Sequence, residues 1–303
     1  MSLQIFAKKT MILLDGKLTS QKIVQDIKSE VQQLAADNER PPHLGAILVG
    51  ENPASRVYVR NKIRMCDEVG FDSTVIRLPA QTQESELLEK VNAWNRDDSL
   101  DGYIVQLPLP DHIRADRINL AIAPKKDVDG FHPHNVGRMS LGLPAYLPAT
   151  PQGILTLLEH YQIKLEGKRV AVLGRSNIVG RPISILLSQN RPVGNATVTV
   201  LHSRSKDTHS ELKKADVIIA AIGSPNFVTV DMVKEGAIVI DVGINRVEDS
   251  SRKKGYRLCG DVDFNSVKGK VDYITPVPGG VGPMTVVSLL INTLKAAKKE
   301  VYG

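Results

Sequence analysis

The sequence predicts an α/β fold in which parallel strands alternate with helices. Short apolar runs such as AILVG, VAVLG and AIVIDVG recur along the chain, and segments of helical periodicity separate them. Runs that are apolar throughout are typical of strands covered on both faces, as in a parallel sheet. The 303 residues exceed one ordinary domain of ~150, so we expect two domains.

Composition excludes several classes of protein. The chain is 42% hydrophobic and 24% charged, as in globular proteins and unlike disordered or fibrous ones. No apolar run reaches the ~18 residues of a membrane span, and the start MSLQIFAKKT lacks the apolar core of a signal peptide. We therefore expect a cytoplasmic protein without membrane contact. Residues 1–10, before Met11, are interpreted as a tag or an extension.

In the first half of the chain, MILLDGK predicts a short strand and a turn, followed by a helix over residues 19–36. The runs AILVG, STVIRLP and DGYIVQLPLP predict three strands buried on both faces. Residues 124–150 contain Gly, Pro and Asn at irregular spacing. We therefore expect loops there and a domain boundary near residue 150.

In the second half, β-branched runs predict four strands, KRVAVLG, NATVTVLH, DVIIAAIG and AIVIDVG, with a further strand at YITPVPG. This alternation is typical of a Rossmann-type nucleotide-binding domain, expected over residues 150–282. Residues 283–303 predict a helix with proline near its start. We expect this helix to return to the first domain, residues 11–149, and a cleft to lie between the domains.

The segment GRSNIVGRP follows VAVLG, where a Rossmann strand turns into its first helix. Gly174, Ser176 and Gly180 are small residues that can cradle phosphate at a helix start, although Ser176 replaces the middle glycine of the GxGxxG pattern. Arg175 lies inside the same turn. A tight turn with a purely structural role is the alternative.

The end of the next predicted strand indicates which cofactor is bound. LHSRS places Ser203 and Arg204 where an NAD-binding domain usually carries an acidic residue for the ribose. A carboxylate would repel a 2′-phosphate, whereas serine and arginine can bind it. The sequence therefore favours NADP over NAD. A solvated loop is the alternative reading of Arg204 and Lys206.

A second polar cluster lies in the predicted helix ENPASRVYVRNKIRMCDEVG. At about 100° per residue, Ser55, Tyr58 and Lys62 share one patch that borders the apolar stripe. Tyr58 and Lys62 are four residues apart and can touch. A lysine desolvated beside a phenol is suited to general acid–base use. A surface pair with an extended lysine is the alternative.

The cysteines and histidines do not predict a metal site. Cys66 and Cys259 are isolated, with no CxxC pair, so we expect two small buried side chains. His132 and His134 have no third ligand at a metal spacing, and we expect both in a loop. We therefore predict no metal.

Taken together, these segments resemble one family, the tetrahydrofolate dehydrogenase/cyclohydrolases. Six segments look like the family's signatures and follow its order from about Met11 to the C-terminus: SRVYVRNK, DGYIVQLPLP, PKKDVDGFHPHNVGR, PATPQG, GRSNIVGRP and TPVPGGVGPMT. The resemblance implies NADP-dependent oxidation of 5,10-methylenetetrahydrofolate and hydrolysis of the methenyl product to 10-formyltetrahydrofolate. It also implies a homodimer, with a folate-binding catalytic domain and an NADP-binding domain.

The resemblance also assigns roles on the folate side. Lys62 stands at the catalytic lysine and Tyr58 at the stacking tyrosine, with Ser55 at the serine of the same helix. Gln106 stands where a glutamine orients the lysine without adding charge. Asp129 stands where an aspartate accepts N–H groups of the pterin ring. For Asp127 we keep the structural role of turn capping, which is common for aspartate in loops.

Further positions follow from the same resemblance. Gly174, Arg175 and Ser176 are expected at the nicotinamide and phosphates, and Ser203 near the adenosine ribose. The remaining positions are Thr150 and Ile244 on the cofactor side and Pro278, Gly279 and Gly280 at the folate cleft. For the glycine-rich VPGGVGP, a structural turn is the alternative.

Three other functions were weighed. A relative with dehydrogenase activity alone would be expected to lack the lysine at position 62, but Lys62 is present. A non-catalytic nucleotide-binding relative would be expected to lose the folate-side residues, but Tyr58, Gln106 and Asp129 are present as well. A nucleic-acid binder fits a net charge of +6 only weakly, because no long Lys/Arg run occurs and aromatic residues are 4% of the chain. We therefore expect tetrahydrofolate derivatives as substrates, and no nucleic acid.

Overall fold

The computed structural model describes residues 11–252 and 255–302. The interpretation of residues 1–10 lies outside these described residues. The chain divides into two compact units. The first unit consists of Ser20–Gly153 and the chain from Thr285 onward, and the second consists of the chain up to Thr19 and Ile154–Met284.

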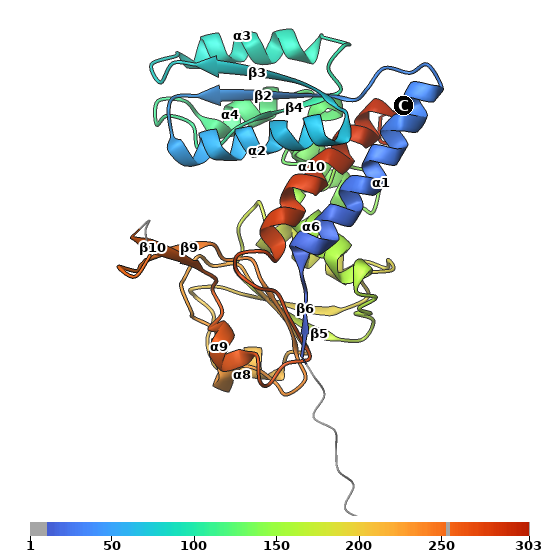
Figure 1. Cartoon of the computed structure of the whole chain (residues 1–303). Coiled ribbons are helices and arrows are strands. Elements are labelled where there is room, and N and C mark those ends of the chain that lie inside the picture. Colours follow the sequence, from blue (N-terminus) through green and yellow to red (C-terminus); the bar gives the residue numbers. More distant parts are fainter. Residues whose placement is uncertain (1–10, 253–254, 303) are drawn as a thin grey trace, which may run out of the picture. The chain divides into compact units, whose positions relative to one another are not determined.

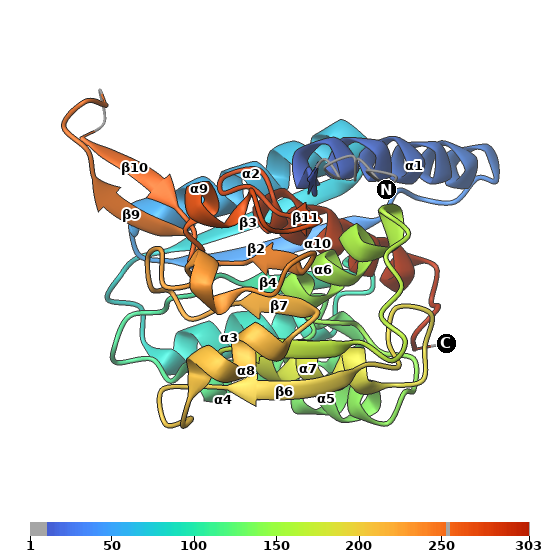
Figure 2. The same ribbon diagram turned by 90° about the horizontal axis from the view of Figure 1, so that it is seen from below.

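The first unit is built on a three-stranded parallel sheet in the order β3–β2–β4. Its strands are β2 (His43–Val49), β3 (Asp72–Leu78) and β4 (Gly102–Val105). The helix α2 (Pro53–Val69) covers one face of this sheet, and α3 (Glu84–Asn95) covers the other with α4 (Ala115–Ala121), as Figures 1 and 2 show. Side-chain alternation explains the two layers, because Ile47 and Val49 of β2 pack in one core cluster with Trp94 of α3.

Two expectations for the first unit are wrong. STVIRLP was expected to be buried on both faces, but β3 is an edge strand and exposes Asp72, Thr74 and Arg77. Residues 124–150 were expected to form loops, but they contain η1 (Pro124–Lys126), α5 (Pro133–Ser140) and the start of α6 (Ala149–His160). His132 caps α5 and His134 lies inside it, because the proline between them occupies the first helical position.

The second unit is built on a six-stranded parallel sheet in the order β1–β11–β8–β7–β5–β6. Its strands are β1 (Ile12–Leu13), β5 (Arg169–Leu173), β6 (Thr197–Leu201), β7 (Val217–Ala220), β8 (Ile238–Asp241) and β11 (Tyr273–Ile274). The order β6–β5–β7 means that the chain reverses its direction of winding between β5 and β7. In a doubly wound sheet, ligands bind at such a point, outside the carboxyl ends of the strands.

Helices and a small second sheet complete this unit. They are α7 (Gly180–Ser188), α8 (Thr208–Lys214), η2 (Val230–Met232) and α9 (Phe264–Val267), with β9 (Asn245–Glu248) paired antiparallel to β10 (Tyr256–Cys259). The pair β9–β10, which was not predicted, forms an arm that leaves the body of the unit (Figure 2). The fold therefore confirms the predicted α/β class with a parallel Rossmann-type sheet.

The elements at the two chain ends differ in detail from the expectation. The predicted domain range 11–149 includes β1, whereas β1 pairs with β11 in the second unit's sheet. The helix α1 runs over Gly16–Ala36, three residues earlier than predicted. The last helix, α10 (Val281–Ala297), begins before Pro283, because the first turn of a helix tolerates a proline. Within residues 11–252 and 255–302, no helix has the length and apolar character needed to cross a membrane.

Candidate active site

Helix α2 carries the first group of predicted site residues, and its ends are well fixed. The Asn52 side chain accepts hydrogen bonds from the backbone N–H groups of Ala54 and Ser55, at 3.0 and 3.1 Å, so it caps the first turn. Gly70 ends the helix in the left-handed conformation, with φ of 84°. Because both ends are fixed by local sequence, the position of Lys62 along the helix is fixed as well.

Lys62, Gln106 and Ser55 come together at the end of β4. The Lys62 Nζ donates to Gln106 Oε1 at 3.3 Å. The Gln106 Nε2 donates to the carbonyl oxygen of Leu107 at 2.7 Å, and Ser55 Oγ donates to the same oxygen at 3.4 Å. The bond from Gln106 Nε2 to Leu107 turns the Gln106 amide so that its oxygen faces Lys62. Tyr58 is 48% exposed on the same helix, so its ring is available to a ligand.

Asp129 and Asp127 have different surroundings although they are two residues apart. Burial raises the pKa of Asp129, and the positive charge of Lys62 opposes that rise, so the two groups lie within electrostatic reach. The Asp127 carboxylate is 2% exposed and accepts from the N–H of His132 at 2.8 Å and from Asn135 Nδ2 at 2.9 Å. Asp127 therefore ties the turn before α5 to Asn135 inside that helix, a structural role as predicted, while His132 is the residue that caps α5.

A residue that was not predicted fixes the segment that carries Asp129. Asn292 of α10 is 1% exposed, and its Nδ2 donates to the carbonyl oxygens of Val128 and Leu147, at 2.8 and 2.9 Å. The only signal in the sequence is a polar residue inside the apolar run SLLINTL. That pattern does not reveal which backbone the amide contacts.

The second unit holds the predicted nucleotide loop at the carboxyl end of β5. Gly174 has φ of 120°, and a Cβ placed there would lie 2.2 Å from the carbonyl oxygen of Ala221. A Cβ on Gly180 would lie 2.2 Å from the carbonyl oxygen of Gly174. The Ser176 Oγ accepts from the backbone N–H of Val179 at 3.2 Å. The loop is therefore a closely packed turn that only glycine permits at two positions.

The turn after β6 leaves its polar side chains exposed. The N–H of His202 donates to Ser205 Oγ at 2.9 Å, and the N–H of Arg204 donates to His202 Nδ1 at 3.1 Å. These local bonds hold the turn, while the side chains of Ser203 and Arg204 are exposed to solvent. No carboxylate occurs among residues 202–206. The end of this strand can therefore accept an anionic group.

The other predicted residues lie in separate places. Ile244 is 52% exposed just after β8 in the second unit, whereas Thr150 lies in the first turn of α6 in the first unit. Pro278, Gly279 and Gly280 precede α10 in the second unit. The Gly279 carbonyl oxygen accepts from the N–H of Lys17 at 2.9 Å, so this segment packs against the start of α1. Its role at a folate site stays a prediction.

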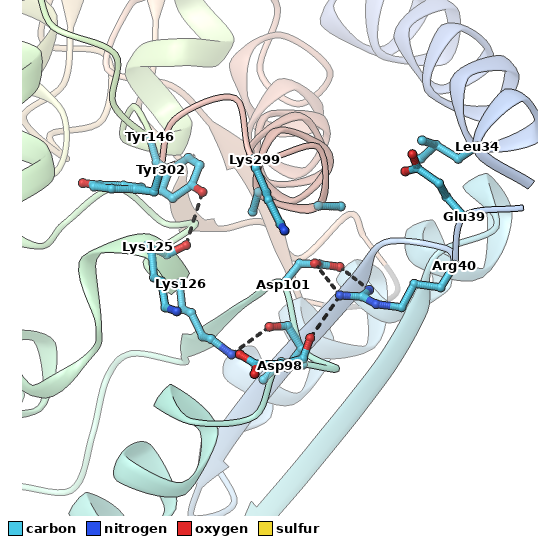
Figure 3. Close-up of a pocket in the computed structure, with 13 residues that line it drawn as sticks. Leu34, Glu39, Arg40, Asp98, Asp101, Lys125, Lys126, Tyr146, Lys299 and Tyr302 are labelled. Carbon is cyan, nitrogen blue, oxygen red and sulfur yellow. Dashed lines mark hydrogen bonds and ion pairs between the residues drawn. The ribbon is translucent and has the colours of Figure 1, made fainter. Parts of the chain in front are cut away.

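A cavity of about 630 Å³ lies elsewhere in the first unit, and no predicted site residue lines it (Figure 3). Two of the basic side chains that line it already have partners. Arg40 donates to both oxygens of Asp101 at 2.8 Å, and the buried Lys126 donates to the carbonyl oxygens of Asp97 and Leu100. Because no predicted site residue lines this cavity, we do not place the substrate there.

Neither cysteine belongs to the site. Cys66 and Cys259 are buried and unbridged, and burial raises the pKa of the Cys66 thiol to about 12. Among the described residues, no group of three or more His, Cys, Asp or Glu side chains is arranged to hold a metal ion.

The sheet order and the glycine-rich turn at its switch point define a class, the α/β proteins with a Rossmann-type dinucleotide-binding unit. Within that class, the chain belongs to the tetrahydrofolate dehydrogenase/cyclohydrolase family. Residues 14–129 match the family's catalytic domain, and residues 148–301 match its NAD(P)-binding domain. These matches confirm the resemblance found in the sequence.

Relatives from several organisms agree with this assignment. The chain is 56% identical over 292 residues to the bifunctional protein FolD of Bacteroides fragilis, covering 96% of this chain and 100% of the relative. The crystal structure of FolD from Campylobacter jejuni is 49% identical, has a TM-score of 0.90, and the match covers 96% of this chain and all of that one. FolD from Trypanosoma brucei, complexed with NADP and an inhibitor, is 38% identical with a TM-score of 0.90, over 97% and 99% of the two chains.

Proposed function

We propose that the chain oxidises 5,10-methylenetetrahydrofolate with NADP⁺ and then hydrolyses the 5,10-methenyl product to 10-formyltetrahydrofolate. The bond from Lys62 to Gln106, within electrostatic reach of Asp129, is the observation that carries the proposal. The nearness of these three residues in the first unit supports their proposed roles as proton carrier, orienting group and acceptor for a heterocycle. The family match supports both reactions.

Lys62 serves the hydrolytic reaction. Addition of water to the methenyl carbon forms a C–O bond and releases a proton, and opening of the five-membered ring needs a proton at the departing ring nitrogen. An amine can perform both transfers. Gln106 accepts from Lys62 Nζ while its own amide is held by Leu107, so the lysine is oriented by a neutral group.

Asp129 and the exposed ring of Tyr58 are the proposed contacts for the substrate. A partly buried carboxylate is best satisfied by a ligand that offers adjacent N–H donors, as a pterin ring does. The Tyr58 ring supplies a flat apolar surface for stacking. Ser55 is proposed to line the same site, and Pro278, Gly279 and Gly280 of the second unit keep the folate-binding role that the resemblance implies.

The second unit is proposed to bind NADP, which supplies hydride acceptance when bound. The turn of Gly174, Arg175, Ser176 and Gly180 lets backbone and a helix start approach phosphate closely. Ser203 is exposed in a turn without a carboxylate, which suits the 2′-phosphate that distinguishes NADP from NAD. Thr150 and Ile244 complete the proposed cofactor contacts.

A variant of Lys62 tests the hydrolytic assignment. The Lys62→Met protein is supplied with methenyltetrahydrofolate, so that hydrolysis is followed without the cofactor, and Arg60→Met serves as a control exposed on the same helix. We expect hydrolysis to fall at least about 100-fold in Lys62→Met and to change less than about twofold in the control. Unchanged hydrolysis in Lys62→Met would remove the proposed role of the lysine.

A cofactor comparison tests the dehydrogenase assignment. Methylenetetrahydrofolate is incubated with NADP⁺ or NAD⁺, and the methenyl absorbance is followed. We expect a higher kcat/KM with NADP⁺. Absence of methenyl formation with both cofactors would reject the dehydrogenase, and equal rates would reject the roles given to Arg175 and Ser203.

We also infer that the protein works in the cytoplasm as a homodimer. Its membership of the family supports this inference. Light scattering after size-exclusion chromatography measures the oligomeric state directly. A mass close to the 33.1 kDa of one chain would contradict the homodimer.

A further inference from the structure

Two buried carboxylates lie at the carboxyl edge of the second unit's sheet, next to the proposed cofactor turn. Asp241 is the last residue of β8 and is 3% exposed, and Asp261 follows β10 and is fully buried. The Asp241 carboxylate accepts from the backbone N–H groups of Gly243, Asp261 and Val262, at 3.0, 2.9 and 2.9 Å. Asp241 therefore holds Asp261 in place through its main chain.

The Asp261 carboxylate in turn holds two other loops. Its Oδ2 accepts from the N–H groups of Ile222 and Gly223, at 2.7 and 3.0 Å, in the loop after β7. Its Oδ1 accepts from Asn245 Nδ2 at 2.9 Å, at the start of β9. One side chain thus joins the segments that follow β7, β8 and β10.

Two glycines lie directly against the carboxylates, where a side chain would not fit. A Cβ on Gly243 would lie 2.3 Å from Asp261 Oδ1, and a Cβ on Gly260 would lie 1.7 Å from Asp241 Oδ2. Glycines at these two positions allow the backbone to approach the carboxylates closely. The loops are therefore held at short range by direct bonds.

Each loop held by Asp261 borders a residue proposed to bind the cofactor. Ala221 precedes Ile222, and its carbonyl oxygen limits the space at Gly174 to that of a glycine. Ile244 lies between Gly243, which Asp241 fixes, and Asn245, which Asp261 fixes. The strands β5 and β7 flank the switch point of the sheet, where a dinucleotide is expected.

We propose that Asp261 is a positioning residue for the dinucleotide, which sets the spacing between the turn after β5 and the segments after β7 and β8. The proposal rests on the proposed NADP-dependent function and adds a residue outside the phosphate turn. A carboxylate suits the position because it accepts three donors without offering one of its own. An asparagine would place an NH₂ group against some of these donors, and an alanine would leave all three unpaired.

The test compares Asp261→Ala and Asp261→Asn with a matched control in the same sheet. The control is Asp216→Ala, because Asp216 also accepts a backbone N–H, that of Arg169 at 2.9 Å, but at the opposite edge of the sheet. For each protein, the KM for NADP⁺, the KM for methylenetetrahydrofolate and the Kd for NADPH by fluorescence titration are measured. Hydrolysis of added methenyltetrahydrofolate reports whether the first unit is intact.

We expect Asp261→Ala to raise the KM for NADP⁺ and the Kd for NADPH by about tenfold or more, and Asp261→Asn to raise them less. The KM for methylenetetrahydrofolate and the rate of hydrolysis should change less than about twofold, as should every value for Asp216→Ala. If Asp261→Ala does not fold, the comparison of Asp261→Asn with Asp216→Ala decides.

Two outcomes overturn the positioning role. One is an unchanged Kd for NADPH in Asp261→Ala, or in Asp261→Asn where only that variant folds. The other is an equal change in the control, which would show general destabilisation of the unit. A wild-type protein that neither binds NADPH nor forms methenyltetrahydrofolate overturns the proposed function as well, so the two failures are distinguished by the wild-type measurement.

Discussion

Asn292 offers a direct test of how the first unit is held together, through the substitution Asn292→Ala. The side chain is 1% exposed and donates two hydrogen bonds, to the carbonyl oxygens of Val128 and Leu147. Alanine removes both donors and leaves two carbonyls without this partner, that of Val128 in a buried place and that of Leu147 in a partly buried one. The segment that ends at Asp129 would therefore lose its attachment to α10.

The magnitude follows from these contacts. An unpaired buried polar group costs about 1–3 kcal/mol, so two carbonyls lower the free energy of unfolding by about 2–6 kcal/mol. Part of this loss is offset, because Asn292 Oδ1 has no hydrogen-bond partner among the described residues and its removal relieves a desolvation cost. We therefore expect a net loss of about 2–4 kcal/mol.

Trp94 makes the measurement specific to this unit. It is the single tryptophan of the chain, 8% exposed and packed edge-on against Tyr103 with ring centroids 5.3 Å apart. Urea unfolding followed by its fluorescence gives the free energy of unfolding of the first unit. Lys298→Ala is the control, because its ion pairs with Glu30 and Glu300 lie on the surface and are worth at most about 1 kcal/mol.

Two results would refute this reasoning. A loss below about 1 kcal/mol for Asn292→Ala would mean that the two carbonyls find other partners at little cost. A KM for methylenetetrahydrofolate equal to that of the wild type would mean that the position of Asp129 does not depend on Asn292.

Three further predictions follow from single contacts. Burial raises the pKa of Asp127 to about 7, so the folded carboxyl holds its proton more tightly than the unfolded one. The stabilisation is complete below about pH 4 and is lost as pH rises through about 7, so the free energy of unfolding should fall by about 2–3 kcal/mol between pH 5 and 8. In urea unfolding, Asp127→Asn should show a smaller fall over the same pH range. Gly174→Ala should raise the Kd for NADPH about tenfold, because its Cβ meets the Ala221 carbonyl; unchanged binding in a fluorescence titration would contradict this. Tyr302→Phe should cost about 1 kcal/mol in urea unfolding, because its O–H donates to Asn135 Oδ1 at 2.6 Å; an unchanged urea midpoint would show that the bond is dispensable.

The sequence predicted the features that depend on local pattern. Apolar runs and helical periods indicated a parallel α/β fold, because strand and helix repeats are imposed by backbone geometry. The tight turn that contains Gly174 and Gly180 could be predicted from its glycines, because few other residues tolerate such close backbone contacts. The resemblance named Lys62, Gln106 and Asp129, and in the structure Lys62 bonds to Gln106 and lies within electrostatic reach of Asp129.

Apart from the return of the last helix to the first domain, features that join distant segments were not predicted. The strand β1 pairs with β11 across some 260 residues of sequence, and its two residues carry no sign of that partner. Asn292 and Asp241 lie in largely apolar runs and Asp261 lies in the segment GDVD, and a sequence does not say which N–H or carbonyl each will meet.

Local sequence thus predicted most of the strands, helices and tight turns, and the resemblance proposed the residues that carry the chemistry. The tertiary structure alone decided which buried polar group satisfies which other. A hydrogen bond acts over about 3 Å, so its partner is known only when the segments are packed together. For this protein, the attachment of the Asp129 segment to α10 and the spacing of the loops around Asp261 are set at that level.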